Sequence, residues 1–408
     1  MNILFVNSFD CSPANSGGVN RVVYVLSRQF MRLTNCQCYL GFYEYQPEDK
    51  PLAEFNGRIK LDQKFNPNEF EKFLTDNHID VIQINFLKKR NLCTIPLIYR
   101  IANKHNIKVL YCLHVCPGFE TVTYGTWERF RYSFVHNGHP LTEFRRWFIT
   151  STRKLVKPFA YLLIRKKYLI PYQNCDKVVL LSSHYKQPYL DIVGLKDSDK
   201  FEAIGNALTF SEFASDTDIQ NKGKQVLVVA RFDEFSKRIS LVLKVWREIE
   251  KDERLTDWTL TLVGTGEAMN FYQYLVKKWK LNRVTFTGHQ NPIEYYRSSS
   301  IFCMTSSAEG WPMTLMEASQ MGVPTVAFDS FGALHDIIED GYNGRIVPNN
   351  NVDAFTEALT NLMLDETTCK QMSYNAIEKS KEFDIEKIVK KWGGLYESLG
   401  KSLGSTNN

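Results

Sequence analysis

The chain has 408 residues, of which 44% are hydrophobic and 23% charged, with 22 Gly and 14 Pro. This composition excludes collagen-like and intrinsically disordered proteins, and the length predicts two or three domains. The 50 Lys and Arg exceed the 45 Asp and Glu by five, a surplus whose meaning depends on where it lies.

The surplus is concentrated in Arg129–Lys167. This segment has ten Lys or Arg against one acid, Glu143, a net charge of +9, so the rest of the chain holds 40 basic and 44 acidic residues, or −4. Aromatic residues interleave with these cations, a pattern suited to an anionic membrane surface at about 1 kcal/mol per cation. We expect peripheral membrane docking here; the alternative is a solvated helical face that packs its aromatics on its own domain. Nucleic acid is not expected, because no binding module accompanies the charge.

Targeting and metal signals are weak. The apolar run Ile3–Val6 ends at Asn7, too early for a secretory signal, and no run approaches the roughly 18 apolar residues of a membrane span. Nine cysteines stand at irregular spacings, and the close pairs Cys36/Cys38 and Cys112/Cys116 lack a second pair that would complete a zinc site. We therefore expect a cytoplasmic protein with free thiols and no bound metal.

The first half of the chain alternates apolar runs with longer segments. Ile3–Val6 predicts a strand, Gly17-Gly18 a loop, and the helical spacing of Val22, Val23, Leu26 and Phe30 a helix. Further strands are predicted at Asp80–Ile84, Lys108–Cys112 and Lys177–Leu181. Strands separated by helix-length segments are typical of a parallel sheet covered on both faces.

The second half repeats this pattern after a polar stretch at 207–223, which we interpret as a linker. Strands are predicted at Gln225–Ala230, Thr259–Val263, Val284–Phe286, Ile301–Met304 and Thr325–Phe328, and helices at Leu241–Glu250, from Met313 onward and at Asp384–Leu399, the last one weakened by Gly393-Gly394. The fold class predicted is α/β, with two doubly wound Rossmann-like domains. Ligands of such sheets bind at the carboxyl ends of the strands, so we expect a site in a cleft between the domains.

The stretch from Ser306 to Ala318 contains two carboxylates on different elements. Pro312 fits the first turn of a helix, which leaves Glu309 in the preceding loop and puts Glu317 in the helix. Backbone amides near Met313 and Thr314 open that helix and favour an anion such as a diphosphate. The carboxylates would accept hydrogen bonds from sugar hydroxyls. The competing interpretation is a capped surface helix with two solvated glutamates.

Arg231 follows a predicted strand, and Lys237 lies six residues later. Two fixed cations at a strand end can neutralise a diphosphate and stabilise it as it leaves; a salt-bridged loop is the alternative. His114 also follows a strand, where it could bind a hydroxyl or be a structural histidine. Gly264-Thr265-Gly266 is not a nicotinamide fingerprint, because Met269 occupies the third glycine position.

Together these residues resemble the retaining glycosyltransferases of family 4, the glycosyl transferases group 1, which have the GT-B fold. The resemblance spans nearly the whole chain. Its motifs are Gly17-Gly18, His114, Val178–Ser183, Ala203–Asn206, Arg231 with Lys237, Leu262–Gly266, Val284–Gly288, the E-x7-E pair Glu309/Glu317, Gly322–Val326 and Asp340–Gly344.

The resemblance implies an N-terminal acceptor domain, 1–206 with a returning helix at 384–400, and a nucleotide-sugar domain at 207–383. The terminal residues themselves predict a disordered tail at 401–408. Arg231 and Lys237 would hold the donor diphosphate, Glu309 and His114 would face the donor sugar, and Glu317 would bind the ribose. The remaining donor-binding residues implied are Gly17, Gly18, Gly264, Gly266, Gly288, His289, Gly310, Trp311, Pro312, Met313 and Thr314.

The activity implied is transfer of a sugar, with retention, from a nucleotide-sugar, a UDP-sugar by family frequency, to a glycan or lipid-linked glycan of cell-surface polysaccharide. No metal or other cofactor is implied. The alternatives are a nucleotide-sugar epimerase of the same fold and a non-catalytic protein that binds a nucleotide-sugar or an anionic surface.

Three stretches depart from the family pattern. The usual Asn-Gly is Asn206-Ala207, the usual Lys-Gly is Lys237-Arg238, and the later Gly-Gly…Pro-Glu is Gly332–Asp336. Arg238 could lie near the donor and alter the choice of sugar, and Asp336 has a shorter reach than glutamate.

Overall fold

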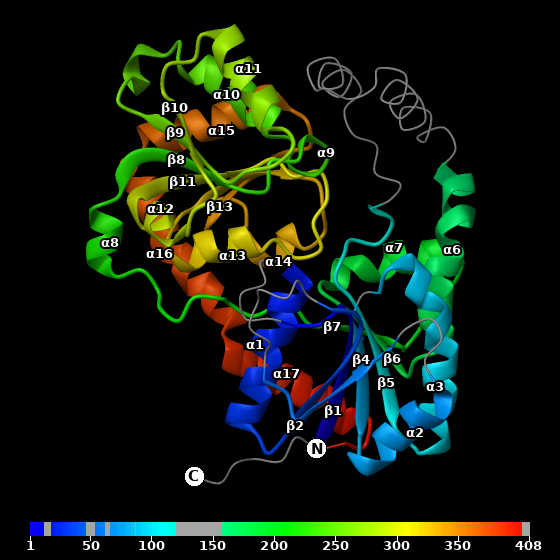
Figure 1. Ribbon diagram of the computed structural model, residues 1–408. Helices are drawn as coiled ribbons and strands as arrows, with labels where there is room; N and C mark the ends of the chain where they lie inside the picture. Colours follow the sequence, from blue (N-terminus) through cyan, green and yellow to red (C-terminus); the bar gives the residue numbers. More distant parts are fainter. Residues whose placement is uncertain (12–17, 46–53, 62–65, 86, 120–156, 402–408) are drawn as a thin grey trace. The chain divides into compact units, whose positions relative to one another are not determined.

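The computed structural model describes residues 1–11, 18–45, 54–61, 66–85, 87–119 and 157–401 (Figure 1). They divide into two compact units: Met1–Gly118, Tyr161–Ala207 and Phe383–Asn408 contribute to the first, and Leu208–Glu382 to the second. Within the described residues, no helix combines the length and apolar character needed to cross a membrane. Most of the basic segment 129–167, and the tail from 402 onward, lie outside the described residues.

The first unit is built on a seven-stranded parallel sheet with the order β3-β2-β1-β4-β5-β6-β7. Its strands are β1 (Asn2–Phe9), β2 (Gln37–Glu44), β3 (Gly57–Lys60), β4 (Val81–Asn85), β5 (Lys108–Leu113), β6 (Lys177–Leu180) and β7 (Phe201–Ala203). Its helices are α1 (Gly18–Leu33), α2 (Pro67–Asp76), α3 (Ile95–Lys104), most of α6 (Lys157–Gln173), α7 (Lys186–Val193) and α17 (Ile385–Ser398).

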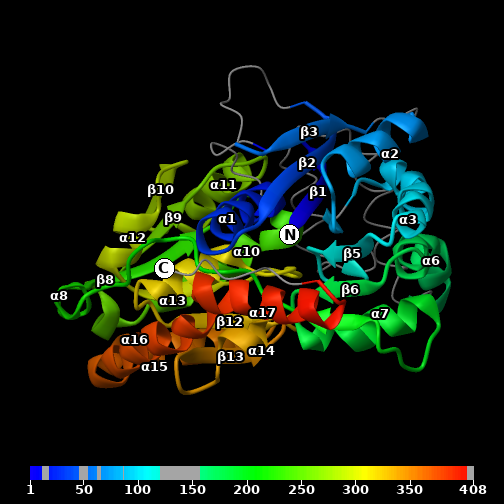
Figure 2. The same cartoon turned by 90° about the horizontal axis from the view of Figure 1, so that it is seen from below.

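Helices α1 and α17 cover one face of this sheet, and Figures 1 and 2 show α2, α3 and α6 on the other. Burial on both faces explains why the central strands are continuous apolar runs rather than alternating ones. On the α1 side, Phe30 of α1 stacks on Phe5 of β1, with ring centroids 6.4 Å apart, and meets the edge of Tyr396 of α17 at 5.9 Å. The last helix therefore completes the core of the first unit.

The second unit has a six-stranded parallel sheet with the order β10-β9-β8-β11-β12-β13. Its strands are β8 (Gly223–Val229), β9 (Thr259–Val263), β10 (Val284–Gly288), β11 (Ser299–Met304), β12 (Thr325–Asp329) and β13 (Gly344–Pro348). Its helices are α8 (Asp216–Gln220), α9 (Glu234–Lys237), α10 (Ile239–Ile249), α11 (Met269–Trp279), α12 (Ile293–Ser298), α13 (Met313–Gln320), α14 (Leu334–Ile337), α15 (Val352–Leu364) and α16 (Glu366–Ser380).

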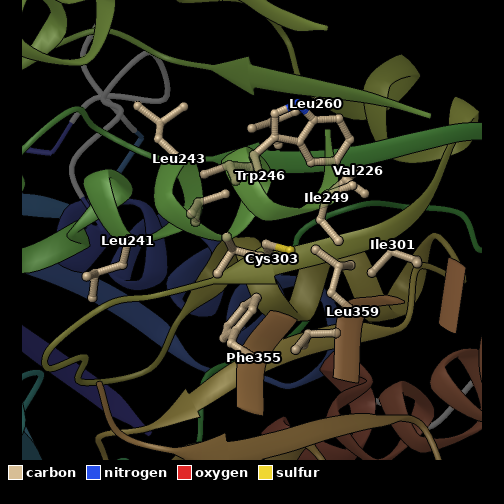
Figure 3. Close-up of a cluster of buried hydrophobic side chains, with 14 of the residues drawn as sticks. Val226, Leu241, Leu243, Trp246, Ile249, Leu260, Ile301, Cys303, Phe355 and Leu359 are labelled. Atoms are coloured by element: carbon tan, nitrogen blue, oxygen red, sulfur yellow. The ribbon is translucent and has the colours of Figure 1, made fainter. Parts of the chain in front are cut away.

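The core of the second unit fills the space between the sheet and helices α10, α11 and α15 (Figure 3). Trp246 of α10 and Phe355 of α15 are fully buried there against β-strand side chains such as Leu260. This packing fixes the sheet, and with it the positions of the loops that leave its carboxyl edge.

The predicted fold class is confirmed, because each unit is a doubly wound parallel sheet. Several elements differ in detail. The predictions omitted β2, β3, β7 and β13, and the expected linker contains α8, which begins at a capping box in which Ser215 and Asp218 bond each other's backbone amides. Gly393-Gly394 does not interrupt α17, since helical packing onto the first sheet outweighs the low helix propensity of glycine.

Candidate active site

The second sheet reverses its strand order between β8 and β11. From β8 the chain adds β9 and β10 on one side and then β11, β12 and β13 on the other. Both neighbours of β8 are parallel to it, so their carboxyl ends share one edge. Ligands of doubly wound sheets bind outside the carboxyl ends at such a reversal. The loops after β8, β9 and β11 therefore form the candidate site.

The loop after β8 is organised by Asp233. Its carboxylate accepts a hydrogen bond from the amide of Phe235 at 3.0 Å, which caps α9, and another from the Ser236 hydroxyl at 2.8 Å. The same carboxylate pairs with the Arg231 guanidinium at 3.1 Å, while the Arg231 side chain is 74% exposed. Arg231 is thus a surface cation whose outer end can turn to an incoming anion.

Lys237, at the end of α9, forms an ion pair with Glu309 in the loop after β11. The two side chains are only 23% and 15% exposed. The structure therefore joins two of the predicted residues that lie 72 positions apart. An ammonium and a carboxylate held side by side can serve a ligand that carries both phosphate oxygens and hydroxyl groups.

The glycines after β9 have a packing role. Gly264 has φ +140°, and a Cβ there would lie 1.9 Å from the carbonyl oxygen of Ala230; a Cβ on Gly266 would lie 2.3 Å from that of Phe232. The amide of Phe232 donates to the carbonyl of Thr265 at 2.8 Å. Only glycine allows this close approach of the two loops. Ligand contact by the two glycines stays a prediction.

The start of α13 lies in the loop region predicted to bind an anion. Pro312 is the N-cap residue, with φ −77° and ψ 97°, one position earlier than the first-turn placement expected from the sequence. Its carbonyl accepts from the amides of Leu315 and Met316, at 3.0 and 3.2 Å. The amides of Met313 and Thr314 precede these first helical bonds, where a helix presents its N–H groups to an anion.

Trp311 and Gly310 complete the approach to α13. Trp311 is 7% exposed and anchors the loop, whereas Gly310 is half-buried. The loop between Glu309 and α13 thus contains one buried large aromatic side chain.

Glu317 points inward from α13 and is 3% exposed. Its carboxylate accepts hydrogen bonds from Thr209 Oγ1 at 3.0 Å and from Tyr296 Oη at 3.2 Å. The Tyr296 hydroxyl also lies 3.1 Å from the carbonyl of Thr314, and with one proton it donates to one of these acceptors at a time. Thr209 and Tyr296 were missed at the sequence level, since neither stands in a recognisable motif.

Gly288 and His289 lie farther along the edge. Gly288 ends β10 with φ +74°, and its carbonyl accepts from the amide of Gly264 at 2.8 Å. Strand β10 is two positions from β8, about 10 Å in the sheet direction. His289 is exposed. Donor contact by these two residues stays a prediction.

His114 belongs to the first unit, where it follows β5. Its Nε2 lies 3.1 Å from Oδ1 of Asn85, the last residue of β4. Burial lowers the pKa of the half-buried His114 imidazole from 6.5 to about 4, so the ring is neutral at physiological pH. Gly18 is the first residue of α1, and Gly17 lies outside the described residues. The cleft expected between the units stays a prediction.

Arg238 does not contact the site in the way its sequence position suggested. Its side chain is buried among the backbone carbonyls of the loop after β11, so its role is within the protein. In the part of the chain that the structure describes, no group of three or more His, Cys, Asp or Glu side chains is arranged to hold a metal ion.

Part of the chain is similar to proteins of a known family. Residues 209–379 match the family model described as "Glycosyl transferases group 1". An uncharacterized glycosyltransferase of Haemophilus influenzae is 30% identical over 224 residues, 54% of this chain and 61% of the relative. The amylovoran biosynthesis glycosyltransferase AmsD of Erwinia amylovora is 30% identical over 238 residues, 57% of this chain and 65% of the relative. The chain thus spans less than two thirds of the length of these curated relatives.

A solved structure extends the likeness to the whole chain. Alr3699/HepE of Anabaena, crystallised in complex with UDP, superimposes with a TM-score of 0.67 and 15% identity over 98% of this chain and all of its own. At this identity the likeness shows the fold, which is GT-B. The match to the glycosyl transferases group 1 model covers residues 209–379, less than half of the chain.

Proposed function

We propose that the protein is a retaining glycosyltransferase that moves a sugar from a UDP-sugar to a glycan or lipid-linked glycan during synthesis of a cell-surface polysaccharide. The observation that carries the proposal is the Lys237–Glu309 pair at the strand reversal, beside the start of α13. The family match, the amylovoran relative and the UDP complex of the HepE structure support the same activity.

Each group has a defined task in this proposal. Lys237, Arg231 and the first amides of α13 bind the diphosphate, and Glu309 accepts hydrogen bonds from the donor sugar. Glu317 is already supported by Thr209 and Tyr296, and it accepts hydrogen bonds from the ribose hydroxyls. The positive charges count most as the diphosphate departs, because it gains negative charge in the transition state.

The transfer breaks the bond between the anomeric carbon of the sugar and the diphosphate oxygen. A bond from the acceptor oxygen to the same carbon forms on the same face, and the acceptor's proton passes to the departing phosphate oxygen. UDP and the glycosylated acceptor are the products. Retention is tested by NMR of the product, whose anomeric configuration should equal that of the donor.

Thermal unfolding with UDP, GDP and ADP is the first experiment. A ligand that binds the native state raises its Tm, so UDP should raise the Tm most. If none of the three changes the Tm, the proposed function is wrong. The nucleotide-sugar that carries this nucleotide should then be turned over only when an acceptor is present. The Glu309→Ala variant should lose this turnover.

The same assays separate the alternatives. An epimerase would convert the donor sugar without an acceptor, and a non-catalytic binding protein would show the Tm shift with no turnover in either the wild type or Glu309→Ala. Acceptor-dependent turnover excludes both.

We further propose that the protein acts at the cytoplasmic face of a membrane, docked through 129–167, most of which lies outside the described residues. Flotation with neutral and anionic vesicles tests this. Binding should require anionic lipid and fall when Arg145, Arg146, Arg153 and Lys154 are changed to Ser. Equal recovery with both vesicles, or no effect of the changes, would contradict docking.

A further inference from the structure

Arg238 occupies a backbone position that favours glycine. It separates α9 from α10 with φ 49° and ψ 42°, in the left-handed region, which side chains other than glycine adopt at a conformational cost. The residue is nevertheless 5% exposed, with a full guanidinium inside the protein. A charged side chain in so strained and buried a position is retained only where the surroundings bind it.

Three nitrogens of the guanidinium have separate partners. Nε donates to the carbonyl of Thr305 at 2.7 Å and Nη2 to that of Ser306 at 2.8 Å, and Nη1 donates to Oδ1 of Asn350 at 2.6 Å. The guanidinium carbon lies 5.6 Å from the centre of the Phe328 ring. Arg238 thus joins the loop after β8 to the loops that follow β11 and β13.

Bonds in the opposite direction tie the same loops. The Thr305 hydroxyl lies 2.8 Å from the carbonyl of Lys237 and 3.1 Å from that of Arg238. The amide of Ser307 donates to the carbonyl of Ser236 at 2.7 Å. Residues 305–307, directly before Glu309, therefore both accept hydrogen bonds from the loop after β8 and donate hydrogen bonds to it.

We propose that Arg238 is a positioning residue that holds the Glu309 loop so that Glu309 stays paired with Lys237 before the donor binds. The inference rests on the proposed function for its effect on the donor. A guanidinium can bind both carbonyls and Asn350 at once because its donors lie in a rigid fork. Glycine at position 238 would adopt the left-handed backbone conformation easily, but it would leave the two loops without the hydrogen bonds of the guanidinium.

The variants Arg238→Gly, Arg238→Lys and Asn350→Ala test the inference, with Arg254→Gly as control. Glycine relieves the left-handed strain, so Arg238→Gly removes the side chain without adding a backbone clash. The Arg238→Lys variant would keep the positive charge but lose the fork. Arg254 is an exposed arginine that pairs with Asp252 before β9 begins, at the opposite edge of the sheet.

Hydrogen exchange of the backbone amides is the decisive readout, because it needs no ligand. Arg238→Gly should speed exchange at 305–309 and leave the strands β8 and β9 unchanged. Arg238→Lys and Asn350→Ala should show smaller increases at the same residues. Unchanged exchange at 305–309 in Arg238→Gly would overturn the proposal. If Arg238→Gly does not fold, unchanged exchange at 305–309 in both remaining variants overturns it.

UDP affinity and turnover connect the loop to function. A small displacement of a binding group costs up to about a hundredfold in turnover, so we expect kcat/KM for the donor to fall about tenfold or more in Arg238→Gly, with the acceptor KM unchanged. Guanidinium chloride, but not equimolar NaCl, should restore part of the loss. Wild-type kinetics in a folded Arg238→Gly would contradict the proposal. Failure of the wild type to bind UDP would instead refute the proposed function and leave the exchange test intact.

Discussion

The two sheets have the same strand order around their reversal but differ in the side chains beside it. In the first unit, neutral side chains adjoin β1 and β4: Asn85 is fully buried and donates to Oδ1 of Asn7 at 3.0 Å. The charged residues near this edge, Asp10 and Glu44, are held in ion pairs with Arg58 and with Lys88 and Arg90. In the second unit, β8 and β11 lead into Arg231, Lys237 and Glu309. The reversal of the first sheet is thus adjoined by a neutral cluster, and that of the second by the charged edge.

The neutral cluster is a continuous chain of hydrogen bonds with one consistent direction. The Tyr396 hydroxyl donates to Gln83 Oε1 at 2.9 Å, and Gln83 Nε2 donates to Asn85 Oδ1 at 3.3 Å. Because that oxygen acts as an acceptor, the neighbouring His114 Nε2 carries the proton, which leaves Nδ1 as an acceptor. The half-buried His114 ring can therefore accept a hydrogen bond from a hydroxyl group at Nδ1.

The largest effect should come from the charged edge. Lys237→Ala and Arg231→Ala should each lower turnover by about a hundredfold or more, because they remove preorganised charge from the leaving diphosphate. Steady-state kinetics with the donor identified by thermal unfolding measures this, with Arg254→Ala as control. Near-normal turnover in both variants would show that the charged edge of the second sheet does not stabilise the leaving diphosphate.

The neutral cluster should matter for stability. Asn85→Leu leaves the donors of His114 and Gln83 and the acceptor of Asn7 without their partner, and a buried polar group without a partner costs about 1–3 kcal/mol. Urea unfolding should show a loss of this size, whereas Asn103→Leu, at an exposed position of α3 in the same unit, should change little. A wild-type free energy of unfolding in Asn85→Leu would show that this hydrogen-bonded chain is not a structural unit.

The His114 pKa predicts a pH dependence with a definite sign. Its folded value, about 4, lies below the ordinary 6.5, so between these values the unfolded chain binds more protons. The stabilisation is complete above pH 6.5 and is lost as the pH falls towards 4, by at most about 1.4 kcal/mol per pH unit. His114→Gln should flatten the unfolding free energy in this window relative to His184→Gln. An unchanged slope would mean that His114 titrates normally.

The smallest effect is expected at the support of Glu317. Tyr296→Phe removes a hydroxyl that lies between Glu317 and the carbonyl of Thr314, and a typical hydrogen bond contributes about 0.5–1.5 kcal/mol. Calorimetry should therefore show UDP binding weakened by less than about tenfold. A loss as large as that of Lys237→Ala would mean that Tyr296 contacts the nucleotide itself.

Strands were predicted most accurately where a single local run of apolar residues is enough to form them. The central strands β5 and β9 are buried apolar runs, and their predicted bounds lie within one residue of the observed ones. Strands β3 and β13 were missed because they are short edge strands whose residues mix polar and apolar types. They therefore lack the continuous apolar run by which the central strands were recognised.

The same distinction holds for the site. Lys237 and Glu309 were identified one by one from their motifs, but their contact needs two loops 72 residues apart. Thr209 reaches Glu317 over 108 residues. The role of Arg238 was misjudged because its position beside Lys237 indicated a ligand contact, whereas the left-handed backbone turns the side chain into the protein.

The last helix has a consequence for the order in which the protein is made. Tyr396 of α17 bonds to Gln83 across 313 residues and packs on Phe30. Helix α17, which completes the core of the first unit, is therefore synthesised only after the whole second sheet. Since domains generally fold as units during synthesis, the second unit can mature on the ribosome while the first waits, with the apolar face of α1 and β1 uncovered, for its closing helix.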